Sequence, residues 1–524
     1  MTRDICSLPH QSRKSVFEDL SHVSSCPHAS GESLDSTGHS VVSADYKPFY
    51  SMLRQLPRES LTDRSRESQT FRESLLRGSR ILFVCAGSQT KKFIYEVAQS
   101  KGVSIVMIDN PDSWSADLKS AGVFDYFLPV DMSQNSDQIF ESAMKAIEQL
   151  APHWSPDGIC TFVELAVELT SRLGKAFGLV HADIDSVTAV RDKSKTRAIL
   201  QGVKSRRVNS EEQLVDALKH IGYPAVIKPV SGAASLCVQR FDTLDEAISL
   251  FHKTMKDFTS SLVVSSGALA RRSQTVGSEE EPADTSISAH SVITTDIMIE
   301  EYLDGPEVDV DIILSDGECQ YANVIDNGPT FEPYFAETWA AIPSLMEPPS
   351  RVLELRDMAV ASLKRLGLTD GVFHVELKYT PRGPRLIEVN ARMGGGPTQT
   401  IHKLVYGVDL VVEQLMIAVG IPSRPPVPSS PLTRVGYAFI NARKTGYVES
   451  VEFLNKYKSR PFVVHIIPFI EPLEICYGPN DGLPSWLGEI VVAHPDGPTA
   501  LRIVQEIEQE IADEFSSLCV PVCL

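Results

Sequence analysis

The sequence predicts a protein of several domains, in which a doubly wound α/β domain precedes domains of mixed α/β and α+β structure. Residues 81–85 form an apolar strand that leads through a turn of small residues into a helix and a second strand ending at Asp109. This order is how a doubly wound parallel sheet begins. Residues 371–392 have the alternating pattern of a β-hairpin. A length of 524 residues exceeds what one hydrophobic core serves, so we expect three or four domains.

Boundaries are predicted where composition and pattern change. Residues 1 to about 45 are rich in Ser and His without an apolar period, which is typical of disorder, and weak helical patterns follow at about 46–76. The predicted parts are a partly disordered N-terminal extension (1–75), an α/β domain (76–185), a smaller domain (186–305) with a mobile, Ser-rich and acidic insertion (259–288), a core (306–425) and a C-terminal α/β subdomain with a β-rich stretch (426–524).

The α/β domain continues with a strand at 158–162 and a helix at 165–177. A further helix begins near Ile184 and is expected to run through Arg191-Asp192-Lys193. The turn after the first strand, Ala86-Gly87-Ser88, has only one of the glycines of the dinucleotide-binding fingerprint. A purely structural α/β domain is therefore favoured here over a cofactor site.

Composition excludes several classes of protein. Hydrophobic residues make up 43% and charged residues 22%, as in ordinary globular proteins. A formal net charge of −19 without a clustered basic patch argues against a nucleic-acid partner. We expect no secretory signal, because the first 15 residues lack an apolar segment, and no membrane span, because no apolar run approaches about 20 residues. The nine cysteines are scattered without zinc-type spacing, which indicates reduced thiols and a cytoplasmic location.

The hairpin at 371–392 carries the strongest chemical signal. Pairing of its strands brings Glu376 beside Glu388 and Asn390, while Ile387 and Val389 are expected on the opposite, apolar face. Two carboxylates and an amide oxygen are hard ligands suited to Mg²⁺ that bridges nucleotide phosphates. Neighbouring carboxylates would repel each other without a cation. The alternative is the solvated polar face of an ordinary hairpin.

A cation and a run of glycines follow the hairpin. Arg392 is succeeded closely by Gly394, Gly395 and Gly396. A fixed guanidinium and free backbone N–H groups are what a developing oxyanion requires. The sequence therefore favours the metal and oxyanion interpretation of this region over a simple surface turn.

Two other segments suggest a nucleotide. An apolar strand at 223–229 places Lys228 next to a loop of small residues at 231–235. The backbone amides of this loop could approach a phosphate. A lysine at a strand end is also commonly a surface charge. The second segment is an acidic connector within residues 299–311, whose backbone could bind an adenine edge and whose carboxylates could accept from a ribose. An ordinary solvated strand end is the alternative there.

In order and spacing these pieces resemble the ATP-grasp superfamily over roughly residues 80–500. The resemblance implies an ATP-grasp fold with a pre-ATP-grasp domain at 76–185, a lid subdomain at 186–305 and a catalytic core at 306–425. It implies ATP-binding roles for Lys193, Lys228, Ser231, Gly232, Ser235, Glu300, Glu301, Leu303 and Glu307, metal ligation by Glu376, Glu388 and Asn390, and catalysis by Arg392 with Gly394 and Gly395. One departure is that Ala234 and Cys237 stand where the family usually has glycines, which would stiffen the lid.

Within the superfamily, the segments 326–330 and 335–338 are similar to carnosine synthases and bacterial L-amino-acid ligases. This likeness implies substrate contacts by Gly396 and by Glu337, which could pair with a substrate ammonium, although an ordinary loop carboxylate remains an alternative. It also makes a homodimer plausible, as in related ligases.

The function that the resemblance implies is an ATP-dependent carboxylate–amine ligase. With ATP and Mg²⁺, for which Mn²⁺ could substitute, a carboxylate would form an acyl phosphate, which an amine would convert into a dipeptide-like amide. The substrates would be small molecules of the amino-acid type. Two rivals stay open at this point: an ATP-grasp carboxylase that activates bicarbonate, and a non-catalytic nucleotide-binding module.

Overall fold

In a computed structural model of the chain, the structure describes residues 33–34, 40–41, 48–150, 154–232, 235–260, 262–265, 268–271, 287–288 and 296–522. Its contacts separate a unit at residues 1–48 from a larger unit at 49–524. In the first unit, β1 (Ser33–Leu34) and β2 (Ser40–Val41) form a small antiparallel pair. The predicted disorder of residues 1 to 45 otherwise lies outside the described residues, as does most of the predicted mobile insertion.

Short helices precede the first domain, as the pattern at 46–76 predicts. They are α2 (Pro48–Gln55), α3 (Arg58–Thr62) and α4 (Arg66–Ser74). The Ser65 side chain accepts a hydrogen bond from the backbone N–H of Ser68 and so caps α4.

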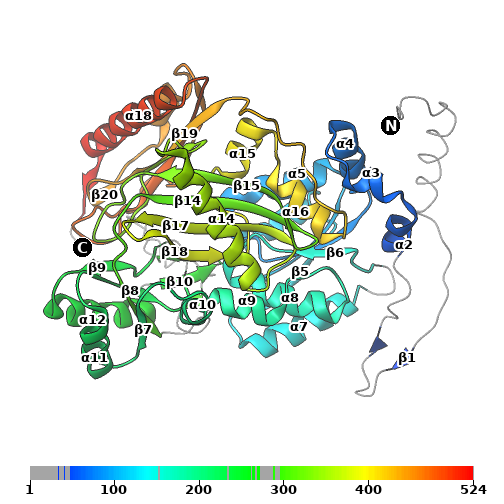
Figure 1. Cartoon of the computed structure of the whole chain (residues 1–524), viewed down its shortest axis with the longest axis horizontal. Helices are drawn as coiled ribbons and strands as arrows, with labels where there is room; N and C mark the ends of the chain where they lie inside the picture. The colour runs from blue at the N-terminus through cyan, green and yellow to red at the C-terminus, as the bar shows by residue number, and fades with distance from the viewer. Residues whose placement is uncertain are drawn as a thin grey trace. The chain divides into compact units, whose positions relative to one another are not determined.

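The first domain contains a parallel sheet of order β5-β4-β3-β6, which confirms the doubly wound prediction. Figure 1 labels β5 and β6 of this sheet. Its strands are β3 (Arg80–Val84), β4 (Ser104–Asp109), β5 (Tyr126–Pro129) and β6 (Gly158–Cys160), and its helices are α5 (Lys92–Ser100), α6 (Asp117–Ser120), α7 (Ser136–Glu148) and α8 (Val167–Ala176). Residues 81–84 of β3 and 105–109 of β4 are buried, as expected of strands covered on both faces. Short 3₁₀ turns lie at η2 (Gln89–Lys91), η3 (Trp114–Ala116) and η4 (Glu164–Ala166).

The helix predicted to run through Lys193 is in fact two helices, α9 (Ile184–Arg191) and α10 (Lys193–Leu200). Asp192 between them has extended backbone angles, φ −93° and ψ 99°. Its carboxylate accepts from the N–H groups of Ser194 and Lys195 at 2.9 and 3.1 Å. Aspartate stabilises the start of a helix better than its interior, so Lys193 becomes the first residue of a new helix.

The second sheet has the order β7-β13-β8-β9 and is antiparallel throughout. It consists of β7 (Ser205–Val208), β8 (Ala225–Pro229), β9 (Gln239–Phe241) and β13 (Ile297–Glu301), with α11 (Glu211–Ile221) and α12 (Leu244–Ser260). Leu214 and Leu218 of α11 pack with Ile227 and Ile299 of the sheet. In the insertion, where no strands were predicted, β10 (Leu262–Ser265), β11 (Ala268–Arg271) and β12 (Ile287–Ser288) pair as a small sheet.

The largest sheet is antiparallel and has the order β18-β17-β14-β15-β16-β19-β22-β21 (Figure 1). Its strands are β14 (Glu307–Ser315), β15 (Glu318–Asn327), β16 (Trp339–Ile342), β17 (Gly371–Thr380), β18 (Gly383–Asn390), β19 (Arg434–Asn441), β21 (Val463–Pro468) and β22 (Trp486–His494). The sheet therefore joins residues of the predicted core and of the predicted C-terminal subdomain.

Helices cover this sheet. They are α14 (Pro349–Arg365), α15 (Thr398–Tyr406), α16 (Leu410–Ala418) and α18 (Gly497–Leu518); the short η5 (Glu452–Leu454), α17 (Asn455–Lys458), β20 (Gly446–Tyr447) and β23 (Val520–Pro521) lie in the C-terminal part. Leu355 and Leu363 of α14 pack on apolar residues of β14 and β17, including Val310. Val504 and Ile507 of α18 pack on β19 and β22. One apolar face is thereby buried, which leaves the other face of β14 and β17 for polar side chains.

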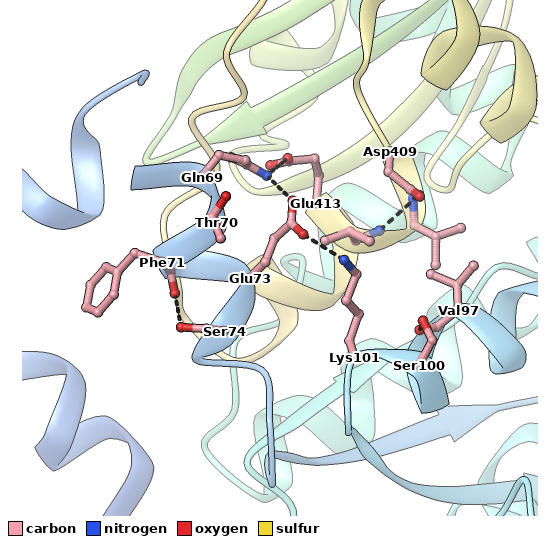
Figure 2. Close-up of polar contacts among 12 residues, drawn as sticks. Gln69, Thr70, Phe71, Glu73, Ser74, Val97, Ser100, Lys101, Asp409 and Glu413 are labelled. Carbon is pink, nitrogen blue, oxygen red and sulfur yellow. Dashed lines mark hydrogen bonds and ion pairs between the residues drawn. The ribbon is translucent and has the colours of Figure 1, made fainter. Parts of the chain in front are cut away.

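A polar network ties α4 to the buried helix α16 (Figure 2). Gln69 donates from Nε2 to Oε1 of Glu413 at 2.7 Å and to Glu73 at 3.1 Å, and Lys101, just after α5, donates to Glu73 at 2.7 Å. The Ser423 hydroxyl donates to the other oxygen of Glu413. Burial raises the pKa of Glu413 to about 7, and the hydrogen bonds from Ser423 and Gln69 oppose this only in part.

Replacing Glu413 with Gln is expected to stabilise the protein above pH 7. The folded state holds the proton of Glu413 more tightly than the unfolded chain does, so this contribution to stability is complete below about pH 4.5 and is lost as the pH rises through about 7. A neutral amide removes that loss, which we expect to raise the free energy of unfolding at pH 8 by about 3 kcal/mol. Urea unfolding at pH 5 and pH 8 checks this, with the exposed Glu318→Gln as control. An equal effect at both pH values would contradict it.

Among the helices that the structure describes, none combines the length and the apolar character that crossing a membrane requires.

Candidate active site

The predicted metal hairpin forms as expected. Glu376 of β17 lies opposite Glu388 of β18, and His374 lies opposite Asn390. The Asn390 amide donates from Nδ2 to Oε1 of Glu376 at 3.2 Å. The three side chains predicted to hold a metal ion therefore converge.

A β-bulge corrects one detail of the hairpin. The register shifts between Glu376 and Leu377, so that Leu377 pairs with Leu386. Leu386 and Val389 consequently belong to the apolar core, whereas Ile387, predicted on that face, is only half-buried. The extra residue turns the carbonyl of Ile387 toward Arg197, whose Nη2 donates to it at 2.6 Å.

The charge distribution at the hairpin suits a divalent cation. Burial and the neighbouring Glu388 raise the pKa of Glu376 to about 8, because two carboxylates repel each other in an enclosed place. Nζ of Lys193 lies 3.0 Å from Oε1 of Glu388. In the part of the chain that the structure describes, no group of three or more His, Cys, Asp and Glu residues is arranged to hold a metal. Two carboxylates with an amide oxygen fit Mg²⁺ shared with phosphates, which would supply the remaining ligands.

A buried ion triad holds the second lysine. Lys228 of β8 and Arg197 of α10 both pair with the carboxylate of Glu300 on β13, and all three residues are buried. Burial would raise the pKa of Glu300, but Arg197 and Lys228 together lower it below its ordinary value. The structure thus uses Glu300, predicted to bind ATP, to hold the two cations. Burial is the main cause that lowers the pKa of Lys228. The nearby charge of Lys193 lowers it further.

The connector after β13 is well ordered by backbone and side-chain contacts. The N–H of Glu301 donates to the carbonyl of Lys204 at 2.9 Å, and the Glu301 carboxylate accepts from Arg382 at 2.8 Å. Leu303 is buried. Glu307, which begins β14, lies 3.5 Å from Nζ of Lys378. Burial raises the pKa of Glu307, and Lys378 opposes the rise.

The predicted phosphate loop follows β8. The Ser231 hydroxyl donates to the carbonyl of Arg191 at 3.3 Å, which brings the loop to the junction of α9 and α10. Gly232 is half-buried, and Ser235 has a positive φ of 53°. Residues 233–234 between them lie outside the described residues. The loop therefore stands beside the helix start that bears Lys193.

Arg392 is anchored on several sides. Its Nη2 donates to Oδ1 of Asn390 at 3.1 Å, and its Nη1 donates to the carbonyl of Met393 at 2.8 Å. Its Nε lies 3.3 Å from Oε2 of Glu164, a residue of η4 in the first domain. Burial raises the pKa of Glu164 and Arg392 opposes this. Glu164 was not predicted, since nothing local in its sequence marks it.

The three glycines after Arg392 differ in their surroundings. A Cβ on Gly394 would stand 2.7 Å from Oγ1 of Thr398 and 2.8 Å from Nδ1 of His374. Gly396 has a φ of +55°, and its Cβ would stand 2.8 Å from the Phe439 ring. A Cβ on Gly395 would meet nothing within 4 Å, so this glycine borders open space.

A hydrogen-bonded network that the sequence did not predict centres on Asp311, next to the hairpin. Asp311 of β14 accepts from His374 at 3.0 Å and from His402 at 2.8 Å, and His402 contacts the Tyr321 hydroxyl at 2.6 Å. Burial would lower the pKa of His374, but Asp309 and Asp311 outweigh it and raise that pKa to about 10. His374 is therefore a cation beside Glu376. Two sequence patterns could have predicted this network. They are the alternating acids of β14 and the alternation of His374 with Glu376 in β17.

Glu337 stands at the open side of this acidic region. Its side chain is solvent-exposed, yet surrounding protein atoms, Asp309 and Glu307 raise its pKa to about 8. Its backbone carbonyl accepts from Nδ2 of Asn441 at 2.7 Å. A carboxyl group in this environment would be stabilised as an anion by a bound cation.

Comparison with known proteins gives consistent results at the level of sequence. A model of the ATP-grasp domain matches residues 269–401. The chain is 31% identical over 377 residues to carnosine synthase 1 of Gallus gallus, a match that covers 69% of this chain and 37% of that protein. It is 26% identical over 318 residues to alanine–anticapsin ligase of Bacillus subtilis, covering 56% of this chain and 62% of that protein. The chain thus spans about two fifths of the length of the carnosine synthases that it matches.

Solved structures agree at the level of the fold. The L-amino acid ligase from Bacillus licheniformis has a TM-score of 0.67 at 22% identity, and the match covers 83% of this chain and 98% of that one. The biotin carboxylase domain of 2-oxoglutarate carboxylase from Hydrogenobacter thermophilus, solved with MgADP and bicarbonate, has a TM-score of 0.57 at 14% identity, covering 82% and 89%. The architecture described above is therefore shared with these proteins.

Proposed function

Because the chain is an ATP-grasp protein, we propose that it is an ATP-dependent ligase that joins the carboxylate of one amino-acid-type substrate to the amine of another. The observation that carries this proposal is the convergence of Glu376, Glu388 and Asn390 beside Lys193, with Arg392 attached to the same asparagine. A module that only binds a nucleotide has no need of this anchored arginine beside a glycine that borders open space.

Each group has a role in this proposal. Lys193 and Lys228 neutralise the phosphates of ATP, with the amides of Ser231, Gly232 and Ser235 above them. The backbone from Glu301 to Leu303 contacts the adenine, and Glu307 the ribose. Glu376, Glu388 and Asn390 hold Mg²⁺, for which Mn²⁺ can substitute. When bound, ATP supplies the phosphoryl group that activates the substrate carboxylate as an acyl phosphate.

The amide-forming half of the reaction uses the other side of the hairpin. The guanidinium of Arg392 and the N–H groups of Gly394 and Gly395 stabilise the oxyanion that develops as an amine attacks the activated carbonyl. A lid that closes over the phosphates would exclude water that otherwise hydrolyses the intermediate. Gly396 and Glu337 contact the substrates, and the carboxylate of Glu337 suits an ammonium group.

Relatives indicate the substrate class. The names carnosine synthase and alanine–anticapsin ligase denote enzymes whose products contain amino acids, and we extend that class to this chain. The same proposal includes a cytoplasmic location, a homodimer as the assembly, and no nucleic-acid or membrane partner. The net charge of −19 supports the exclusion of nucleic acid.

A screen for ADP release tests the proposal. The protein is incubated with ATP and Mg²⁺ in pools of free amino acids, and products of active pools are identified by mass spectrometry. We expect ADP to form only when a carboxylate and an amine substrate are both present, together with a product lighter by one water than their sum. ADP release that depends on bicarbonate would indicate a carboxylase instead. Nucleotide binding without turnover in any pool would indicate a binding module.

A further inference from the structure

One carboxylate near the glycine run takes no part in the roles assigned so far. Glu489 of β22 lies opposite Phe439 of β19 and is only 4% exposed. Its Oε1 lies 3.0 Å from Nε2 of His465, which fixes its orientation. Its Oε2 is buried and has no hydrogen-bond partner among the described residues. A buried charged oxygen without a donor is costly, so such an atom indicates a partner that binds there.

The unpaired oxygen faces the substrate side of the proposed site. It lies 3.5 Å from the position that a Cβ on Gly396 would take. The Phe439 ring, which stands 2.8 Å from the same position, stacks on Trp486 with ring centroids 4.5 Å apart. The carboxylate of Glu489 and the edge of the Phe439 ring therefore border Gly396 together.

The surroundings are acidic. Burial raises the pKa of Tyr437 on β19, and Asp309, Glu337, Asp311 and Glu489 add to this rise. These four carboxylates therefore lie around one tyrosine, and two of them, Asp309 and Asp311, already pair with His374. At Gly396 itself Glu489 offers one unpartnered carboxylate oxygen beside an aromatic ring, which is a poorer ligand set for a divalent metal than for an organic cation.

We propose that Glu489 binds the ammonium group of the amino acid whose carboxylate is activated, and so makes the enzyme select amino acids over acids that lack an amino group. This inference rests on the proposed ligase function. The amine that attacks must first lose its proton, so only the other substrate keeps an ammonium group throughout the reaction. A protonated amine supplies the hydrogen-bond donor that Oε2 of Glu489 lacks.

The test compares amino acids with their desamino analogues. Binding of L-alanine, propionate, L-phenylalanine and 3-phenylpropionate to the full chain with MgADP is measured by calorimetry, and ADP release is measured in parallel. We expect the wild type to bind at least one amino acid roughly 10- to 100-fold more tightly than its analogue, the range of one hydrogen bond to a charged group. Glu489→Gln should bring that ratio to about threefold or less, while the KM for ATP stays unchanged.

Controls separate the possible outcomes. Glu449→Gln, an exposed carboxylate of the same part of the chain, should keep the wild-type ratio. Glu489→Asp keeps the charge and should give an intermediate ratio, which serves if the Gln variant fails to fold. Equal binding of amino acid and analogue by the wild type, or an unchanged ratio in Glu489→Gln, would overturn the inference. A ratio that depends on Glu489 in a protein without ADP release would support the site while rejecting the ligase function.

Discussion

Replacing Glu388 with Gln is expected to abolish substrate-dependent ADP release while leaving the fold intact. The amide keeps the size of the side chain and can still accept from Lys193, which lies 3.0 Å from Glu388 in the wild type. It cannot supply the negative charge that holds a divalent cation between Glu376 and the phosphates. Loss of that cation removes the main neutralisation of charge in phosphoryl transfer, so we expect turnover to fall roughly 10³-fold or more.

The measurement is the initial rate of ADP release with the best substrate pair, at saturating ATP and over a series of Mg²⁺ concentrations. Glu318→Gln, an exposed carboxylate at the start of β15 in the same sheet, is the matched control and should keep full activity. Thermal unfolding should be similar for both variants. If Glu388→Gln retains wild-type turnover at low Mg²⁺, the metal assignment is wrong.

Replacing Glu300 with Gln is expected to cause the largest loss of stability among single polar substitutions near the site. Glu300 is the common partner of Arg197 and Lys228, and all three residues are buried. The amide would leave two buried cations with no neutralising charge, and breaking a buried ion pair in this way typically costs 3–5 kcal/mol. We therefore expect a decrease of about 3–5 kcal/mol in the free energy of unfolding.

Urea unfolding of Glu300→Gln at pH 7 checks this value. The control is Glu506→Gln, which breaks an exposed pair with Arg502 one helical turn away in α18. That substitution should cost about 0.5 kcal/mol or less, since solvent screens the pair. Equal losses in the two variants would show that the triad does not stabilise the fold as described.

Local patterns were enough to predict much of this molecule. The parallel start of the first domain and the hairpin with Glu376 and Glu388 follow from apolar alternation and turn residues, which act over a few positions. The break between α9 and α10 was also readable, because Asp192 precedes Ser194 and Lys195 with the spacing of a helix cap. It was missed because the polar run at 191–197 contains no Gly or Pro to mark a helix end.

Other features depend on contacts between distant residues, which local patterns do not encode. Pairing of β16 with β19 joins Trp339 to Ala438 in one sheet, although the intervening chain includes whole helices. The bulge at Glu376 is likewise set by the packing of Leu386 rather than by a turn signal. Glu164 and Glu489 reach the site from separate regions of the chain, and only their burial distinguishes them from surface acids.

The contact between Glu164 and Arg392 has a consequence for how the protein can be divided. One anchor of the arginine comes from the turn after β6, so the first domain helps to aim a guanidinium that belongs to another part of the polypeptide. A fragment that begins after residue 185 would keep the whole hairpin but would lose the contact between Arg392 and Glu164. Exchange of the N-terminal domain for that of a related protein would therefore have to preserve this single acid to keep the arginine oriented.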